Sequence, residues 1–359
     1  FTFQGKRTTA DLFDLFGLGD DIKNTLPQMA KDFWPVLLVS LIISILIIII
    51  QRKKLVVKSK PKSPYKTSNW LVASIALPLA FLGARGSWDL KPLRIANAAS
   101  VGHPGAAPLI LNTPFTIIKT IGAPIMELRF EMDEKEALLQ FKREKSNGAN
   151  EQFRTMNVVV IILESFSAEY STLLTGKKGY TPFLDSLMQQ SLYFSHAYAN
   201  AKKSIDGIPA VTSSIPALMP VSYITSPYSA NRTTSIAGLL VDEGYTSAFF
   251  HGGNNGTMGF DNFSRISGHQ RYFGRSEYGS EDYDGHWGVF DEPFYEFTVK
   301  ECSKMKQPFA ITFFSLSSHH PYSIPEKLQG RFPKGELPIH ESIGYADYAL
   351  RAFFKVASK

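Results

Sequence analysis

The sequence predicts an α/β fold, with helices covering a mostly parallel β-sheet. The first observation is VVVIIL at 158–163, a continuous aliphatic run typical of a strand buried on both faces. The second is a pair of later strand candidates, TSAFF at 246–250 and PFAITFFSLS at 308–317. The third is a helical pattern between them, beginning with TPFLDSLMQQ at 181–190, where Thr181 is the predicted cap and Pro182 lies in the first turn. Strands that alternate with helices favour a parallel sheet.

Two apolar segments precede this region. WPVLLVSLIISILIIII carries no charge, and about 20 apolar residues cross a bilayer core, so we predict a transmembrane helix over 33–51. A buried core helix is the alternative, but a soluble helix rarely lacks a polar face. The second segment ends in Trp70 and Trp88 and contains Pro78, and it predicts a kinked membrane helix over 68–88.

A basic loop over 52–67 separates the two apolar segments. The stretch 51–67 holds seven Lys and Arg residues and no acid, so the net charge of +6 falls to −1 without it. Because the basicity is local, it indicates membrane topology and argues against a nucleic-acid partner. The loop is therefore predicted to be cytoplasmic, with residues 1–32 and everything after Trp88 outside the cytoplasm.

Residues 89–150 are predicted to form an extracytoplasmic linker near the membrane. They mix Pro, Gly and Ala with β-like runs such as TPFTIIKTI at 113–121. DEKEALLQFKREKS at 133–146 predicts a charged surface helix, which NGAN ends. The pattern then changes, and 151–359 is predicted to be one α/β domain.

Polar side chains follow three predicted strands. Glu164 follows the first, His251 the second, and His319 and His320 the third. Parallel strands bring their carboxyl ends to one edge of a sheet, where sites form. A partly buried Glu164 there needs a metal ion or a Lys or Arg partner, or it serves as a helix cap. The histidines could donate a proton, bind an anion or a metal, or simply bond to a backbone carbonyl.

Ser204 is the candidate nucleophile. It lies in NAKKSIDGIP, after two lysines and at a predicted helix start, where a hydroxyl could attack a phosphate or sulfate ester. Helix capping by this serine is the alternative.

Taken together, these motifs resemble the lipoteichoic acid synthase group of the alkaline phosphatase and sulfatase superfamily. The motifs that carry the resemblance are VVVIILESFS, TPFLDSL, NAKKSIDGIP, FFHGGNNGTMGF, QPFAITFFSLSSHHPY and YADYALRAFF. Their order and spacing are more specific than any one of them. The resemblance implies a sulfatase-type domain anchored in the cytoplasmic membrane, with its catalytic part on the extracytoplasmic side. It also implies a membrane lipid or envelope glycan as substrate.

The resemblance further implies roles for single residues. Glu164 and Ser204 fall on metal-ligand positions, and Ser204 falls on the nucleophile. His319 falls on a histidine that contacts the substrate's phosphate, and His251, in the HG turn, is the second predicted substrate-binding residue. The implied cofactor is a divalent cation, Mn²⁺ or Mg²⁺, with Ca²⁺ and Zn²⁺ as further options. The implied reaction transfers a phosphoglycerol group through a covalent phospho-enzyme.

Three departures from the family pattern matter. Position 204 is Ser where the family has Thr, a swap that the chemistry tolerates. Gly259 and Asp261 lie near places where the family has Trp and Arg, which argues against strict lipoteichoic acid synthesis. The family continues with a strand ending in Asp-His, whereas this sequence stops at Lys359, so the fold is predicted to be C-terminally incomplete.

Two other functions stay open. A sulfuric ester hydrolase would mature a Cys or Ser in a C/S-x-P-x-R motif, but Cys302 lacks that motif and Ser214, in SIPAL, has Leu218 where Arg belongs. A catalytically incomplete membrane module is the other alternative, and the missing Asp-His strand motivates it.

Overall fold

The computed structural model describes residues 34–55, 74–81, 83, 93–101, 107–122, 133–140, 154–219, 221–279 and 281–358. The chain divides into two compact units, of which one contains Ala123–Lys359 and the other contains Thr8–Arg94. The predicted segment 1–32, most of the basic loop and much of the second predicted membrane helix lie outside the described residues.

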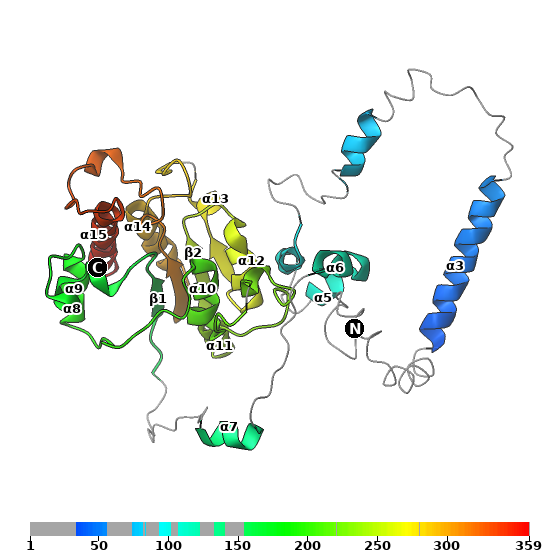
Figure 1. The fold of residues 1–359 in the computed structure, drawn as a ribbon, viewed down its shortest axis with the longest axis horizontal. Coiled ribbons are helices and arrows are strands. Elements are labelled where there is room, and N and C mark those ends of the chain that lie inside the picture. The colour runs from blue at the N-terminus through cyan, green and yellow to red at the C-terminus, as the bar shows by residue number, and fades with distance from the viewer. Residues whose placement is uncertain are drawn as a thin grey trace. The chain divides into compact units, whose positions relative to one another are not determined.

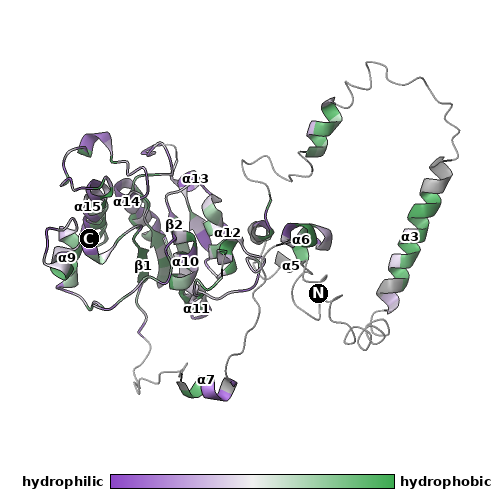
Figure 2. Ribbon diagram, viewed as in Figure 1, coloured by the Kyte–Doolittle hydropathy of each residue, from purple (hydrophilic) through white to green (hydrophobic). Residues whose placement is uncertain are grey.

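Helix α3 (Trp34–Leu55) holds the first apolar segment. It is 22 residues long, and Figure 2 shows most of it in the colour of hydrophobic residues. The side chains of residues 36, 37 and 51–55 are outside the description. Over the residues that are described, no helix combines the length and the apolar character that crossing a membrane requires. The membrane helices over 33–51 and 68–88 therefore remain predictions.

The linker contains short helices rather than strands. These are η1 (Ile95–Ser100), α5 (Ala107–Ile110), α6 (Thr113–Thr120) and α7 (Glu134–Gln140). The β-like interpretation of 113–121 is wrong, because its threonines bond to helix carbonyls: Thr116 Oγ1 donates to Thr113 O at 2.9 Å and Thr120 Oγ1 to Thr116 O at 2.8 Å. Helix α7 lies within the charged segment that predicted a helix.

A parallel four-stranded sheet forms the centre of the larger unit, as predicted (Figure 1). Its order is β1 (Val158–Ile162), β4 (Phe309–Phe314), β2 (Thr246–His251) and β3 (Arg271–Phe273), and all neighbours run parallel. Val160 lies opposite Thr312, which lies opposite Phe249 on the other side. β4 therefore lies between β1 and β2, both of which precede it in the chain. The short edge strand β3 was not predicted.

Helices cover both faces of this sheet. The longer elements are α9 (Pro182–Met188), α10 (Ser204–Ser213), α11 (Ile236–Asp242), α12 (Phe260–Ile266), α14 (Asp291–Cys302) and α15 (Ile339–Ala357). The shorter ones are η3 (Ala168–Tyr170), α8 (Thr172–Thr175), η4 (Tyr223–Thr225), η5 (Thr257–Gly259), α13 (Arg275–Tyr278) and η6 (Glu326–Leu328).

Alternate side chains of each strand pack on opposite faces, as strand geometry requires. On β2, Phe250 joins one core cluster with residues of α14 and α15, whereas Phe249 joins a second cluster with Ile208 of α10 and Phe263 of α12. Figure 1 shows α14 and α15 on one side of the strands and α10 and α12 on the other. The result is a helix–sheet–helix sandwich.

Helix α9 starts where the sequence predicted, but it is capped from far away. Asp347 of α15 accepts hydrogen bonds from the N–H groups of Phe183 and Leu184 at 2.8 and 2.9 Å. The predicted cap, Thr181, makes no side-chain cap bond, and its hydroxyl donates to Tyr170 O at 3.1 Å instead. Asp347 thus fastens α9 to α15.

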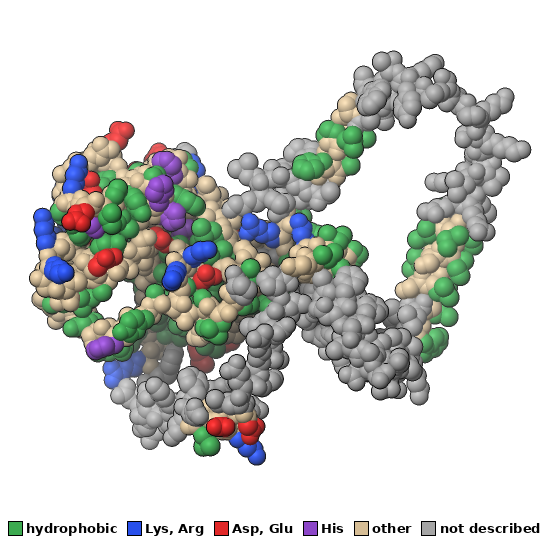
Figure 3. All heavy atoms as spheres, in the orientation of Figure 1, with side chains coloured by type: hydrophobic (Ala, Val, Ile, Leu, Met, Phe, Trp, Pro, Cys, Tyr) green, Lys and Arg blue, Asp and Glu red, His purple; other side chains and the backbone are tan. Residues whose placement is uncertain are grey.

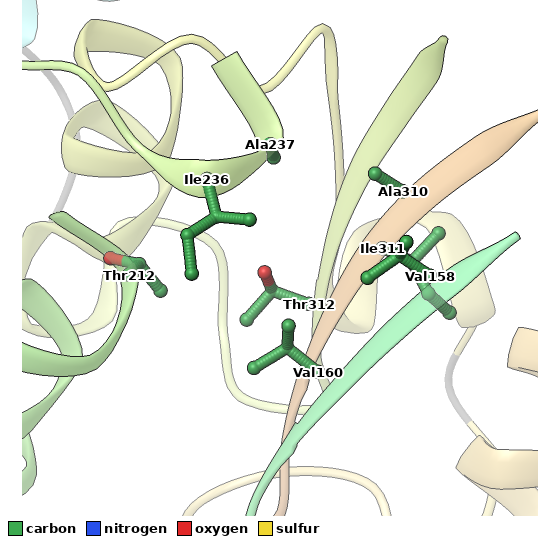
Figure 4. Close-up of a pocket in the computed structure, with 8 residues that line it drawn as sticks. All are labelled: Val158, Val160, Thr212, Ile236, Ala237, Ala310, Ile311 and Thr312. Atoms are coloured by element: carbon green, nitrogen blue, oxygen red, sulfur yellow. The ribbon is translucent and has the colours of Figure 1, made fainter. Parts of the chain in front are cut away.

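The packing between the sheet and α11 is tight. Figure 4 shows Ile236 and Ala237 of α11 and Thr212 of α10 around Val160 and Thr312 of the sheet. The gap among them measures about 10 Å³, which is room for a water molecule at most. This face of the sheet is core rather than a ligand site.

Candidate active site

Glu164 and Ser204 meet at the carboxyl edge of the sheet. Glu164 lies two residues beyond β1, and Ser204 is the first residue of α10. Ser204 Oγ donates to Glu164 Oε2 at 2.6 Å, across forty residues of sequence. Both side chains are half-buried. The two residues that sequence reasoning placed in one centre are therefore in direct contact.

Hydrogen bonds from the end of β4 hold Glu164 in place. Its backbone N–H donates to Ser315 Oγ at 2.8 Å, and its carbonyl oxygen accepts from the hydroxyl of Ser318. Its second carboxylate oxygen, Oε1, accepts from Ser165 Oγ at 3.0 Å. Ser165 has a φ of 58°, a conformation that is uncommon for a residue with a side chain. The β1 and β4 ends thus position one carboxylate together.

Neither side chain acts as a helix cap among the described residues. The Ser204 hydroxyl donates to Glu164, and α10 has no side-chain cap bond at its N-terminus. The Glu164 carboxylate accepts only from the hydroxyls of Ser204 and Ser165 within the described part of the chain. The capping alternatives therefore do not describe this structure.

His319 lies beside these groups. It follows Ser318, which bonds to Glu164, and consecutive Cα atoms are about 3.8 Å apart. The ring of Trp287 packs against its imidazole with centroids 4.3 Å apart, and His319 Nδ1 lies 2.9 Å from His320 O. In Figure 3, histidine side chains gather on one face of this part of the chain. His319 is half-buried at the edge where the strands end.

His251 is enclosed by the core. It is 1% exposed, its Nδ1 lies 3.2 Å from Phe314 O, and its ring stacks on Phe314. Burial lowers the pKa of His251 to about 4, with a smaller effect from the nearby His319, so its imidazole is neutral at pH 7. These contacts give His251 a packing role, and its contact with substrate remains a prediction.

Gly252, Gly253 and Gly288 allow the turn after β2 to approach the loop that precedes α14. Val289 N donates to Gly252 O at 3.0 Å, and Gly253 forms a bridge with Gly288. A side chain on Gly288 would overlap the Gly252 carbonyl, so this crossing requires glycine. The crossing places Trp287 next to the end of β4.

Sequence reasoning missed Trp287 and Asp291. Asp291 is 2% exposed and accepts from the N–H groups of Leu316 and Ser317 at 2.8 and 3.0 Å. Burial raises the pKa of Asp291 to about 6, and the negative charge of Glu164 adds to this rise. The acidic start of the helix that follows HWGVF indicates a helix cap. It does not indicate that Asp291 contacts the residues after a strand that lies far away in the sequence.

The acidic edge suits a divalent cation. Glu164 has no Lys, Arg or His partner within the described part of the chain, although a partly buried carboxylate needs one. A second buried carboxylate, Asp291, lies close enough to sense its charge. The described residues contain no group of three His, Cys, Asp or Glu side chains placed to hold a metal. Glu164 and Ser204 therefore offer two hard oxygen ligands, the kind that Mg²⁺ and Mn²⁺ prefer.

Comparisons with known proteins identify relatives of this chain in sequence and in fold. Lipoteichoic acid synthases 2 and 1 of Bacillus subtilis (strain 168) are 25% and 27% identical to this chain over 214 and 211 residues. These matches cover 56% and 55% of this chain, but only 33% of each relative, so the chain spans about a third of their length.

A crystal structure of a protein in the alkaline phosphatase superfamily from Vibrio parahaemolyticus aligns with a TM-score of 0.54 at 31% identity. The alignment covers 58% of this chain and 52% of that one. The sulfatase family model matches residues 156–359, which include both core clusters and the Glu164–Ser204 contact. This chain therefore belongs to the sulfatase family.

Proposed function

We propose that this chain is the catalytic part of a membrane-anchored, metal-dependent enzyme that transfers phosphate-ester head groups, with phosphoglycerol on a membrane lipid as the donor. The observation that carries the proposal is the 2.6 Å contact between Ser204 Oγ and Glu164 Oε2 at the carboxyl edge of the sheet. The resemblance to lipoteichoic acid synthases supports a phosphoglycerol donor. The predicted membrane helices would keep the site at the extracytoplasmic surface.

In this proposal Ser204 is the nucleophile. Its hydroxyl hydrogen points to Glu164 Oε2, which leaves lone pairs of Oγ available to a phosphorus atom. A bond forms from Oγ to phosphorus, the bond from phosphorus to the lipid alkoxide breaks, and the alcohol leaves with the serine proton. An acceptor hydroxyl or water then attacks phosphorus, the bond from phosphorus to Oγ breaks, and the proton of the attacking group passes to Oγ of Ser204.

Other residues bind and orient the phosphate. Lys202 and Lys203 are exposed beside Ser204 and would attract an anionic head group. His319, held by Trp287, would contact the phosphoryl oxygens. Glu164 and Ser204 would hold a divalent cation, which lowers the hydroxyl pKa and neutralises phosphoryl charge when bound.

Sulfate-ester hydrolysis is the second candidate, because the matching family model is that of sulfatases. Its formylglycine version would need Ser214, which follows the last residue of α10 and is exposed. At 1.5 Å per residue it lies about 15 Å along the helix from Ser204. Ser214 is therefore far from Glu164, and a phosphate ester remains the preferred substrate.

The test uses the full chain in detergent with Mn²⁺ and bis(4-nitrophenyl) phosphate. The parent protein should release nitrophenol and yield a phosphorylated Ser204 peptide on rapid acid quench. Ser204→Ala should lose both, and the control Ser214→Ala should keep both. Turnover that survives Ser204→Ala removes the nucleophile assignment, and turnover of 4-nitrophenyl sulfate without a phosphopeptide favours the sulfatase alternative.

A further inference from the structure

A groove of about 630 Å³ lies next to the candidate active site. Its walls include Tyr283, Phe290 and Tyr322, with the acidic residues Asp284, Glu326 and Glu341. Pockets of 300–1,000 Å³ are typical of small-ligand sites. No residue of the Glu164–Ser204 centre lines it, so the groove is a separate feature that the chemistry at Ser204 does not use.

Two chain segments connect the groove to the site. Tyr322 N donates to His319 O at 2.8 Å, which closes a turn and keeps their Cα atoms within about 7 Å. On the opposite wall, Asp284 Oδ1 accepts from the N–H of Trp287 at 2.7 Å, and Trp287 packs on His319. A ligand in the groove would therefore lie one turn away from His319, the residue that we propose contacts the phosphate.

The groove offers aromatic surface and unused hydrogen-bonding groups. The guanidinium of Arg275 lies 3.6 Å from the ring centre of Tyr283, which fixes that ring and leaves its other face free of this contact. Within the described residues, the hydroxyls of Tyr283 and Tyr322 and the side chains of Glu326 and Gln329 have no hydrogen-bond partner. Rings flanked by carboxylate and amide groups suit the C–H faces and hydroxyls of a sugar.

Charge decides which substrate fits. The groove contains three carboxylates, on Asp284, Glu326 and Glu341, and one ammonium group, on Lys334, so its formal charge is −2. An anionic ligand would meet net repulsion there, whereas a neutral one would not. The anionic donor therefore belongs beside Lys202 and Lys203, and the groove suits an uncharged acceptor.

We infer that this groove binds a neutral polyhydroxylated acceptor, such as an unsubstituted oligosaccharide, rather than a growing chain of glycerol phosphate. The inference rests on the proposed function. A hydroxyl of the bound acceptor attacks the phosphorus on Ser204, the bond from phosphorus to Oγ breaks, the acceptor proton passes to Oγ, and the sugar phosphodiester leaves.

The first experiment measures binding without turnover. Full-length Ser204→Ala protein in detergent is titrated with maltotetraose, cellotetraose and chitotetraose by saturation-transfer NMR, alongside a glycerol phosphate tetramer. At least one tetrasaccharide should bind, and Tyr283→Ala should weaken it by about tenfold. Glu326→Gln, an exposed and conservative change, should weaken it several-fold. The exposed Tyr198→Ala and Glu296→Gln are the matched controls and should have no effect.

Two outcomes overturn the inference. One is that no tetrasaccharide binds, or that binding ignores both Tyr283→Ala and Glu326→Gln. The other is that the glycerol phosphate tetramer binds and that Tyr283→Ala weakens this binding.

The second experiment measures transfer from a phosphodiester donor to the tetrasaccharide with Ser204 intact. Tyr283→Ala should lower the ratio of transfer to hydrolysis by about tenfold, and Glu326→Gln should lower it several-fold. If the parent protein binds sugar but turns over no phosphodiester, the proposed function fails while the groove assignment stands. If the parent protein turns over the phosphodiester but the variants leave the ratio unchanged, the groove assignment fails while the proposed function stands.

Discussion

The indole of Trp287 packs against the imidazole of His319, and its Nε1–H donates to His320 O at 2.7 Å. Two interactions from one side chain therefore hold both residues of the His-His pair. The loop that carries Trp287 is itself held by Asp284 Oδ1, which accepts from the N–H groups of residues 286, 287 and 288. Trp287 is thus a positioning residue for His319.

Trp287→Ala should raise KM for a phosphodiester more than it lowers kcat, because His319 loses its support while Ser204 keeps its contact with Glu164. Trp287→Phe keeps a ring but no donor and should give an intermediate KM. Steady-state kinetics of both variants provide the measurement. An equal effect of the two changes would mean that ring packing contributes nothing, and a fall in kcat alone would contradict the positioning role.

Glu164→Gln should weaken Mn²⁺ binding by at least about tenfold, because it removes the charge but keeps the shape of a proposed ligand. Electron paramagnetic resonance titration of free Mn²⁺ reads this out without turnover. Glu169→Gln, an exposed neighbour five residues on, is the control and should bind Mn²⁺ as the parent does. Equal affinity in Glu164→Gln would place the cation elsewhere.

His269 should make the fold less stable in acid. Burial lowers its pKa from 6.5 to about 4, with Nδ1 3.2 Å from Ser264 O and Nε2 3.1 Å from Thr312 Oγ1. Between pH 6.5 and about 4 the unfolded chain binds a proton at this histidine that the folded chain does not, so the contribution of His269 to the free energy of unfolding falls as pH falls.

His269→Gln should flatten that pH dependence, measured by urea unfolding at several pH values between 4 and 7. The exposed His196→Gln should leave the slope as it is in the parent. A slope that is the same in His269→Gln would show that this imidazole titrates normally in the folded state.

Gly288→Ala should destabilise the fold by about 1–3 kcal/mol, because the added methyl group overlaps the Gly252 carbonyl. Gly207→Ala makes a useful contrast. Gly207 lies inside α10 with no atom near the new methyl group, so alanine should raise stability by about 0.5–1 kcal/mol. Thermal unfolding of the two variants measures the change in stability that each causes, and the two changes should have opposite signs. Similar shifts would mean that the crossing loop adjusts without cost.

Much of the fold was visible in the sequence because strand burial leaves a local pattern. The aliphatic run of β1 and the aromatic run of β4 identified buried parallel strands, and polar residues after them marked the site edge. β3 was missed because its three residues, RYF, are too few to show the alternating pattern of a strand. The threonines of α6 favoured a strand, but their hydroxyls bond to the helix backbone instead.

The rest of the site depends on contacts that no local pattern records. Asp347 caps a helix that lies 164 residues earlier in the chain, and Trp287 meets His319 through a crossing of glycines. The Glu164–Ser204 pair was predicted through family resemblance, since residue type alone also allowed two helix caps. The groove was not predicted, because its walls come from loops rather than from periodic elements.

The position of β4 between β1 and β2 affects how this protein is made. A nascent chain exposes β1 and β2 before their shared partner exists. β2 ends at residue 251 and β4 at residue 314, so 314 less 251, or 63, residues must follow. At roughly 5–20 residues per second, translation takes about 3–13 s to supply them. Throughout that interval the edges of β1 and β2 that will pair with β4 are unpaired, so incompletely synthesised chains of this protein expose two apolar strand edges that favour aggregation.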